Sequence, residues 1–493
     1  MGRNAFANLA RGASFSLFSV VLPLFLASYL AKDEYAVWVL ALQIGSYVSL
    51  LDFGVQTAVV RFVAHASAGG STERVPALLR TAVRWLAAMA VLGVVVVGVV
   101  AALLGTLFPK LPTSMLAGAR LAILLIAVSL SFTLPVAVLA SWFVGLQRNS
   151  VPALAIVVPR VVATAVVAAL ARQGVGIVAL AAVIAASNFA ANIALVALFR
   201  RAGGRLGPRS LRVPGLTREL VSFSWVLTVW TLSMLVIQGI DTLVVGRVEF
   251  SALGAYGFAG AVVTLLAGAM SNVFSVLVAP AARLTARGEA TGLVDMVERA
   301  TRFGSMALGV VGFSLFAGAG IVAGFLPLSY RSDAAMFLRV LVVAQAIRLC
   351  VVPFASVLVG AGDHRFAVIG AVAEAVANLV ASVVFGVAFG AIGVAYGTLV
   401  GSIVGLFASV LLTMRLTTTF RIDRRRFVAH GLLRPLLVTS PLMVVGWLCI
   451  GRSPSVTVMA LLVGLSLSGA LILAFGLDGS ERAQLRVRRS LTP

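Results

Sequence analysis

The segment 85–108, WLAAMAVLGVVVVGVVAALLGTLF, has no charged residue and lies between Arg84 and Pro109. A helix needs roughly 20 apolar residues to cross the hydrocarbon core of a membrane. The whole chain has a matching composition, because 61% of its 493 residues are hydrophobic and 11% are charged. Soluble domains carry about 25% charged residues. The sequence therefore predicts an all-α polytopic membrane protein.

Apolar runs of this length recur along the chain and are separated by Arg, Pro or Gly clusters. We predict fourteen transmembrane helices, near residues 12–31, 36–60, 85–108, 116–146, 151–171, 176–199, 220–246, 252–282, 303–326, 336–359, 366–388, 390–414, 435–450 and 455–477. The division between the runs that meet at 388 and 390 has the weakest sequence signal.

Positive charge is distributed unevenly between the two sides that these spans define. If the N-terminus is cytoplasmic, the inside segments hold 28 Lys and Arg residues and the outside segments hold 6. Cytoplasmic loops carry the excess of Lys and Arg in membrane proteins, so both termini are predicted in the cytoplasm. The net charge of +22 is thus a topology signal and does not indicate nucleic acid as a partner.

Two basic stretches divide the spans into groups of six, six and two. The sixes resemble repeats, because Val144-Gly145 matches Val359-Gly360 at an offset of 215. Each half has an even number of spans, so the repeats are parallel, and such halves enclose a substrate path. We predict an N-terminal six-helix lobe at 1–199, a basic linker at 200–219, a C-terminal six-helix lobe at 220–414, a basic loop at 415–434, two extra helices at 435–477 and a basic tail at 478–493.

Small and polar residues at one-turn spacing predict how some of these helices pack. Gly393, Gly397, Gly401 and Gly405 recur every four residues in the twelfth span. This small-xxx-small spacing indicates close helix packing rather than a ligand site. Asn188 and Asn192, one turn apart in the sixth span, indicate hydrogen bonds to a neighbouring helix.

Residues typical of catalysis are scattered. His65, His364 and His430 lie in three different cytoplasmic loops, and Cys350 and Cys449 lie in separate spans. These spacings match no metal site, no nucleophile with its base and no disulfide framework. The predicted external loops are also too short for the extracytoplasmic domain that a glycan polymerase or ligase would need. The sequence predicts no catalytic residue, metal or cofactor, and it favours transport over catalysis.

Ionisable side chains inside the spans are the candidates for a binding site, because each costs about 2.5–3.5 kcal/mol at the centre of a helix. Arg160 and Arg348 lie near mid-depth of the fifth and tenth spans. Glu374 lies at mid-depth of the eleventh span, and Asp241 lies in the outer third of the seventh. With the nearby amides, the candidate cavity residues are Arg160, Arg348, Gln345, Asp241, Glu374 and Asn378.

Two interpretations of these charges are open: a cationic wall for an anionic substrate, or ion pairs that only hold helices together. The repeat places Arg160 within one residue of the equivalent of Glu374. The two could therefore pair between the lobes in one conformation and act as a gate. Asp52, at the end of the second span, is explained as well by interfacial snorkelling or helix-end packing as by function. Arg120 and Arg339 are expected to snorkel towards the outer surface.

The segment 28–64, SYLAKDEYAVWVLALQIGSYVSLLDFGVQTAVVRFVA, resembles the opening of a known transporter family. Further along, Gln238-Gly239-Ile240-Asp241-Thr242-Leu243 and Val359-Gly360-Ala361-Gly362-Asp363 resemble parts of that family's second half. It is the polysaccharide transporter family, the Wzx-type flippases of the multidrug/oligosaccharidyl-lipid/polysaccharide exporter superfamily. The likeness covers about the first twelve predicted helices.

The resemblance implies two six-helix lobes around a central cavity, two extra helices and alternating access to the two faces of the membrane. The implied substrate is an oligosaccharide on a polyprenyl pyrophosphate, carried across the bacterial inner membrane for O-antigen (lipopolysaccharide) or exopolysaccharide biosynthesis. The implied partners are this lipid-linked oligosaccharide, membrane lipids, a glycan polymerase and export machinery. Guanidinium groups suit such a substrate, because they are permanently charged and bind phosphate through two hydrogen bonds.

Three alternatives are open. A cation-coupled multidrug antiporter of the same superfamily would use buried acids in its first half, where Asp52 is the only candidate. A flippase for the peptidoglycan lipid precursor would share the fourteen helices and a cationic cavity. A membrane-bound glycan-processing enzyme is disfavoured by the short external loops.

Overall fold

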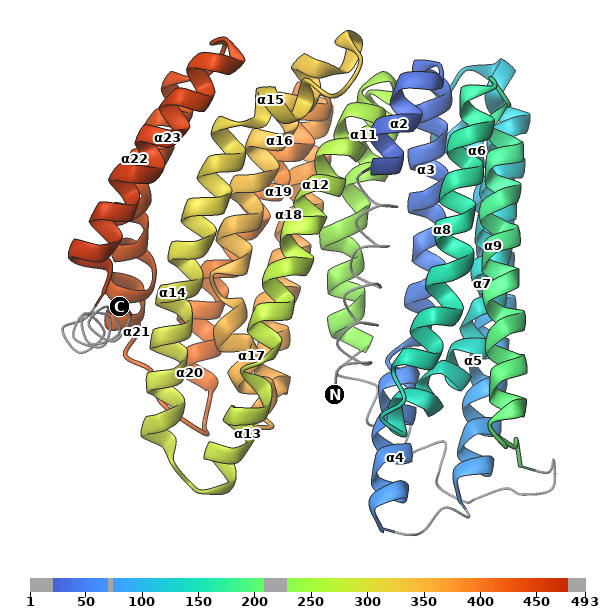
Figure 1. Ribbon diagram of the computed structural model, residues 1–493, viewed down its shortest axis with the longest axis horizontal. Coiled ribbons are helices and arrows are strands. Elements are labelled where there is room, and N and C mark those ends of the chain that lie inside the picture. Colours follow the sequence, from blue (N-terminus) through green and yellow to red (C-terminus); the bar gives the residue numbers. More distant parts are fainter. Residues whose placement is uncertain (1–20, 70–73, 208–227, 478–493) are drawn as a thin grey trace, which may run out of the picture. The chain divides into compact units, whose positions relative to one another are not determined.

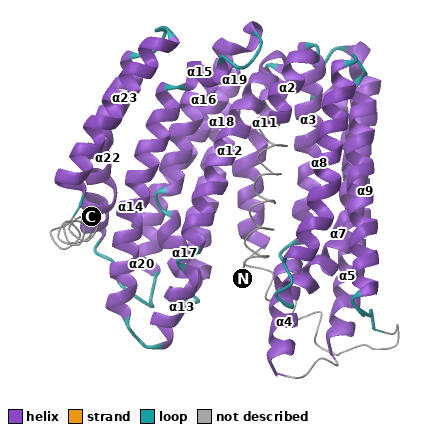
Figure 2. Cartoon of the chain, in the orientation of Figure 1, coloured by secondary structure: helices purple, strands orange, loops and turns teal. Residues whose placement is uncertain are grey.

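The computed structural model describes residues 21–69, 74–207 and 228–477 of the chain. Within these ranges every regular element is a helix, and 13 helical segments are long and apolar enough to cross a membrane (Figure 2). The predicted fold class, an all-α polytopic membrane protein, is confirmed. The predicted first span, 12–31, lies mostly outside the described residues, and only its end is seen, as α2 (Leu22–Tyr29).

The chain forms two compact units, Met1–Phe258 (unit 1) and Ala259–Pro493 (unit 2). Helix α12 (Leu253–Ser275) crosses the boundary between them. Within each unit, long helices run alongside one another and are joined by short turns (Figure 1). The predicted linker, 200–219, falls partly in the range 208–227, which lies outside the described residues.

Unit 1 is built around α7 (Leu116–Gly145). This helix packs against α3 (Lys32–Ser49), α4 (Val55–Gly69), α5 (Val75–Ala102) and α9 (Ile177–Arg201). The other described elements of unit 1 are η2 (Leu50–Asp52), α6 (Leu104–Leu107), η4 (Thr113–Met115), α8 (Ser150–Arg172), the π-helix η5 (Val236–Ile240), α11 (Asp241–Val248) and η6 (Phe250–Ala252).

Unit 2 is built around α14 (Ala290–Ala317), α16 (Leu328–Leu349) and α19 (Ala391–Ala408). Helix α14 packs against α16 and α22 (Arg434–Leu448), and α19 packs against α16 and α18 (His364–Phe389). The remaining described elements are α13 (Val278–Ala286), α15 (Ala319–Ala323), α17 (Val352–Gly360), η7 (Ser409–Thr413), α20 (Met414–Leu416), α21 (Arg424–Arg426), η8 (Phe427–Leu433), α23 (Pro454–Leu471) and η9 (Ile472–Gly476).

The predicted second span, 36–60, is wrong at its second end, because the helix stops at Asp52 and a new helix, α4, starts at Val55. Phe53 (φ 49°) and Gly54 (φ 77°) adopt left-handed backbone conformations in the turn between them. The Asp52 carboxylate accepts a hydrogen bond from the Gly54 N–H and stabilises this turn. The structure therefore gives Asp52 the helix-end role that was one of the interpretations open for it.

Other helix ends show what the apolar runs could and could not predict. The predicted span 85–108 is helical over Val75–Ala102, and the predicted span 435–450 is part of a helical segment from Arg424 to Leu448. Arginine is a good helix former, so the first Arg marks the edge of the apolar run and not the end of the helix. The predicted division between the eleventh and twelfth spans, near 388/390, is confirmed. Gly390 (φ 71°, ψ −151°) forms the turn between the two helices in a backbone conformation that only glycine adopts readily.

Cationic side chains donate hydrogen bonds to the C-termini of two helices in unit 1. Arg120 donates hydrogen bonds to the carbonyl oxygens of Ala101 (2.9 Å) and Ala102 (3.0 Å), where α5 ends. Arg247 likewise donates to the Leu107 carbonyl at the end of α6. The last carbonyls of a helix lack backbone partners and carry partial negative charge, so a cation there is favourable. Arg120 thus caps a neighbouring helix, a specific contact beyond the expected snorkelling.

Candidate functional site

Helices α18 and α19 approach each other along the glycine stripe of α19. A Cβ atom added at Gly393, Gly397, Gly401 or Gly405 would lie 1.9–2.8 Å from atoms of α18. The backbones can therefore come this close only because these side chains are absent. The predicted packing role of the stripe is confirmed. The consequence for the site is that Glu374 lies over Gly405 and Asn378 lies over Gly401.

Arg348 lies where the tenth span is interrupted. Helix α16 ends at Leu349, and α17 begins at Val352 with Pro353 in its first turn. Proline has no N–H to donate and its ring clashes with the carbonyl four residues earlier, which here belongs to Leu349. The break leaves Arg348 in the last turn of α16, where the helix dipole favours a cation.

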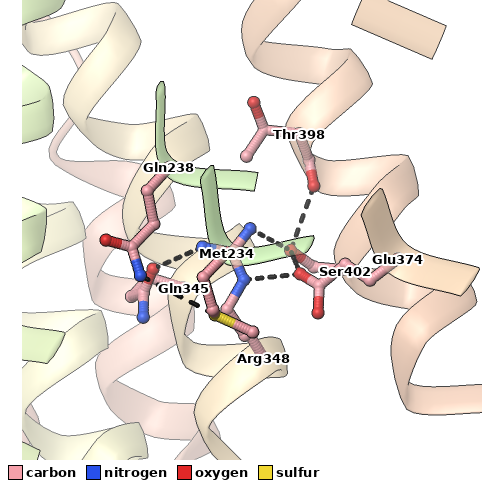
Figure 3. A network of polar contacts seen from close by, with 7 residues as sticks. All are labelled: Met234, Gln238, Gln345, Arg348, Glu374, Thr398 and Ser402. Carbon is pink, nitrogen blue, oxygen red and sulfur yellow. Dashed lines mark hydrogen bonds and ion pairs between the residues drawn. The ribbon is translucent and has the colours of Figure 1, made fainter. Parts of the chain in front are cut away.

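The Arg348 guanidinium joins three helices through hydrogen bonds (Figure 3). Its Nε donates to Glu374 Oε1 of α18 at 2.5 Å, and its Nη1 donates to Gln345 Oε1 of α16 at 2.9 Å. Ser402 Oγ of α19 lies 3.5 Å from Arg348 Nη2 and 3.4 Å from Glu374 Oε1. We call these four residues the Arg348 cluster. The Gln238 to Met234 contact drawn in the same view belongs to unit 1 (Figure 3).

The Arg348 cluster is buried inside unit 2. The side chains of Arg348 and Glu374 are 13% and 7% exposed, and Ser402 is fully buried. Low dielectric makes each charge expensive alone and strengthens the attraction between the two. The guanidinium therefore needs a negative partner at this depth, and Glu374 supplies it in this conformation.

Sequence reasoning found three members of the cluster and missed the fourth. Gln345 was expected beside Arg348 from its i−3 spacing, and this contact is confirmed. The pairing of Arg348 with Glu374 was not expected, because the rotation of two helices about their axes is set by packing. Ser402 was missed altogether. Its position directly after Gly401 gave no usable signal, because adjacent residues point about 100° apart around a helix and Ser402 does not share the face of the stripe.

The remaining candidates lie elsewhere. Asn378 is fully buried one turn beyond Glu374, on the same face of α18. Asp241 and Arg160 belong to unit 1. Asp241 is 5% exposed and begins α11 directly after the π-helical turn η5. Arg160 is half-buried in α8, after Pro159. The predicted pair of Arg160 with Glu374 would join the two units, and it stays a prediction.

A second polar group, in unit 1, has a structural explanation. Asn188 Nδ2 donates to Ser129 Oγ at 2.9 Å, and Asn192 Nδ2 donates to Thr133 Oγ1 at 3.1 Å. Both bonds join α9 to α7, and the one-turn spacing of the asparagines is matched by the spacing of their acceptors. The predicted interhelical role of this stripe is confirmed.

With this fold, the chain resembles solved membrane transporters. The lipid II flippase MurJ in an inward closed conformation matches with a TM-score of 0.74, 14% sequence identity, and coverage of 96% of this chain and 98% of that one. An inward-facing multidrug resistance MATE family transporter matches with a TM-score of 0.65, 14% identity, and coverage of 82% and 93%. The eukaryotic MATE transporter AtDTX14 matches with a TM-score of 0.62, 14% sequence identity, and coverage of 88% of this chain and 98% of that one. At these identities the likeness establishes the fold.

The family is established by the sequence itself. Residues 1–281 match the model of the family described as polysaccharide biosynthesis protein, which is more than half of the chain, and the protein belongs to that family. The resemblance found in the sequence is thereby confirmed. No curated protein matches the chain.

Proposed function

We propose that the protein is a flippase that carries oligosaccharides linked to polyprenyl pyrophosphate across the bacterial inner membrane, by alternating access. Family membership supports a role in polysaccharide biosynthesis, and the fold supports transport. The O-antigen and exopolysaccharide pathways are the proposed settings. A glycan polymerase and export machinery are the proposed partners.

The observation that carries this proposal is the guanidinium of Arg348, buried at an interrupted helix in the interior of unit 2. A pyrophosphate cannot cross hydrocarbon without a counter-charge. Arginine stays protonated at any physiological pH and offers a planar set of donors that matches phosphate oxygens. The polyprenyl tail can remain in the lipid while the charged headgroup passes through the protein.

Glu374 gives the site a way to bind and release its substrate. One carboxylate now satisfies Arg348 Nε, and an entering pyrophosphate would replace that carboxylate with a more highly charged acceptor. Ser402 Oγ lies near both Arg348 and Glu374, so its hydroxyl can keep a hydrogen bond with Arg348 when the pyrophosphate replaces Glu374. When the headgroup leaves, Glu374 returns to Arg348. Arg160 is the proposed second partner that the released Glu374 meets in another conformation.

A second candidate function is transport of the peptidoglycan precursor, as in the lipid II flippase MurJ. The specific observation in its favour is that the MurJ fold covers 96% of this chain. Both substrates present a polyprenyl pyrophosphate, so the Arg348 cluster serves either one. They differ in the attached glycan.

Transport of defined substrates into proteoliposomes separates these functions. We expect the protein to move a polyprenyl-pyrophosphate-linked repeat oligosaccharide and to move lipid II at least tenfold more slowly.

Arg348→Ala should abolish transport, and Arg348→Lys should retain a fraction of it, because a lysine keeps the charge and loses the planar donor set. Arg172→Ala, an exposed arginine at the end of α8, is the control and should transport normally. Normal transport by Arg348→Ala would reject the role of the cluster, and preference for lipid II would select the second candidate.

A further inference from the structure

The segment 417–433, which joins α20 to α22, is held in place by a carboxylate. We call this segment the basic platform. Asp363, in the turn between α17 and α18, accepts hydrogen bonds at Oδ2 from the backbone N–H groups and hydroxyls of Thr418 and Thr419, at 2.6–3.4 Å. Four donors on one carboxylate oxygen fix the start of the platform to the neighbouring helices.

Aromatic residues fix the platform a second time. Phe420 is 3% exposed and Phe427 is fully buried, and both belong to the hydrophobic core cluster that also contains Phe354 of α17. The rings of Phe354 and Phe420 pack edge to face with their centroids 6.2 Å apart. The polar residues between the two phenylalanines are therefore attached to the core on both sides.

The acidic groups in and beside the platform already have partners. Asp423 caps α21 by accepting hydrogen bonds from the N–H groups of Arg425 (2.9 Å) and Arg426 (3.4 Å). Glu298 of α14 pairs with Arg426 at 3.2 Å. Arg421, Arg424 and Arg425 are exposed, and within the described part of the chain no acidic side chain forms an ion pair with them.

We propose that Arg421, Arg424 and Arg425 bind the phosphate headgroups of anionic phospholipids in the cytoplasmic leaflet. Large apolar side chains at its two ends, Leu416 just before it (47% exposed) and Leu433 as its last residue (50% exposed), would face acyl chains. The arginines between them therefore lie at the depth of the headgroups. Clusters of basic residues next to a transmembrane helix attract anionic lipids. A charge run that only sets topology needs no fixed backbone, whereas this one is fixed at both ends.

The inference rests on the proposed orientation, with residues 417–433 in the cytoplasm, and not on the transported substrate. Fixing the backbone in advance lowers the entropy lost when headgroups bind. Arg365, exposed beside Asp363 at an N–O distance of 3.8 Å, extends the positive surface towards the start of α18.

Native mass spectrometry of the purified full-length protein in neutral detergent tests the proposal, with cardiolipin, phosphatidylglycerol or phosphatidylcholine added. We expect preferential retention of the two anionic lipids. Arg424→Gln/Arg425→Gln should lose this preference, by about fivefold for each arginine. The matched control Arg172→Gln/Arg452→Gln removes two exposed arginines outside the platform and should retain it. Added salt should weaken the preference, since exposed charges are screened.

Three results would overturn the proposal: equal retention of anionic and zwitterionic lipid, unchanged preference in Arg424→Gln/Arg425→Gln, or equal loss in the control. Arg424→Lys/Arg425→Lys restores the charge and should restore lipid retention, which separates loss of charge from loss of folding. Lipid retention is measured without transport, so a failed flippase assay leaves this proposal standing. A reporter that places residue 422 outside the cell would reject the cytoplasmic leaflet.

Discussion

At the scale of single residues, the depth of an arginine in the helix bundle decides which partner it needs. Arg120 lies near a helix end and is satisfied by backbone carbonyls. Arg426 lies in the basic platform and pairs with a carboxylate that is partly exposed to solvent. Arg348 lies beside the break inside its span, Leu328–Gly360, far from both ends of that span, and takes a buried carboxylate. The sequence predicted these depths, because depth follows from counting along an apolar run, but it did not predict the partners.

The Arg348–Glu374 pair should contribute strongly to stability only as a pair. Arg348→Ala and Glu374→Ala should each destabilise the protein by about 3–5 kcal/mol, because each leaves one buried charge without its partner. The double variant Arg348→Ala/Glu374→Ala should lose less stability than the two single variants together, since it leaves no unpaired buried charge. Unfolding of the purified variants in detergent measures all three values. Strictly additive values would show that the two charges do not interact in the folded protein.

The Asp363 carboxylate should stabilise unit 2 in a manner that depends on pH. Burial raises the pKa of this carboxyl, but the hydrogen bonds from Thr419 and Thr418 together lower it by more than burial raises it. The pKa of Asp363 therefore lies below the ordinary value. Its contribution is therefore complete above the unfolded pKa of about 3.9 and is lost as pH falls through the lower, folded pKa.

The corresponding variant is Asp363→Asn. It should lower the stability by roughly 1.5–3 kcal/mol at pH 7, the range for hydrogen bonds to a charged group. Thermal unfolding at pH values from 7 down to below the ordinary pKa of aspartate should show the difference between the variant and the unmodified protein shrinking as pH falls. A difference that stays constant over this range would mean that the ionised carboxylate is not responsible for it.

At the scale of helices, the four-residue period of the glycine stripe predicted close packing, and the structure adds which helix is packed. Such a period identifies a face, but any of the other helices could have met it. In α18 the matching residues, which include Glu374, Asn378 and Ser382, differ in chemistry and show no small-residue period. For the same reason the sequence could not place Ser402 beside Arg348. That contact depends on three helices meeting at one level.

Adding one methyl group to the stripe should separate α18 from α19. At Gly401 a Cβ atom would lie 2.7 Å from Asn378 Cβ and 2.9 Å from Asn378 Cα. Gly401→Ala should therefore destabilise the protein by about 1–3 kcal/mol and weaken transport by moving Glu374 relative to Arg348. The control is Gly268→Ala in α12, where a Cβ meets nothing within 4 Å. It should be neutral or stabilising by about 0.5–1 kcal/mol, because alanine is the better helix former. Equal effects of the two substitutions would contradict this account.

At the scale of the whole molecule, the 13 spans of the described residues follow the predicted second to fourteenth spans in order. Apolar run length could predict them because each span must satisfy all its backbone groups as a helix within the membrane. The helix ends followed less well, since helices such as α5 continue through their arginines beyond the apolar run. The same arginines nevertheless predict the orientation of the chain in the membrane, because 28 of the Lys and Arg residues fall on one predicted side and 6 on the other.

This asymmetry predicts both termini in the cytoplasm, and reporter fusions at turns that the structure locates test it. Gly174 (φ 73°) and Gly451 (φ 78°) form turns on the predicted outer side. Residues 207 and 422 follow α9 and α20 on the predicted inner side. Alkaline phosphatase, which is active only outside the cytoplasm, should be active when fused after 174 or 451 and inactive after 207 or 422.

Inverting the chain would expose the excess of arginines to the outer face, against the preference for cytoplasmic Lys and Arg. It would also move the basic platform to the other leaflet. Activity after residue 207 or 422 would therefore reject the orientation and the leaflet assignment together, while leaving the contacts of the Arg348 cluster unaffected.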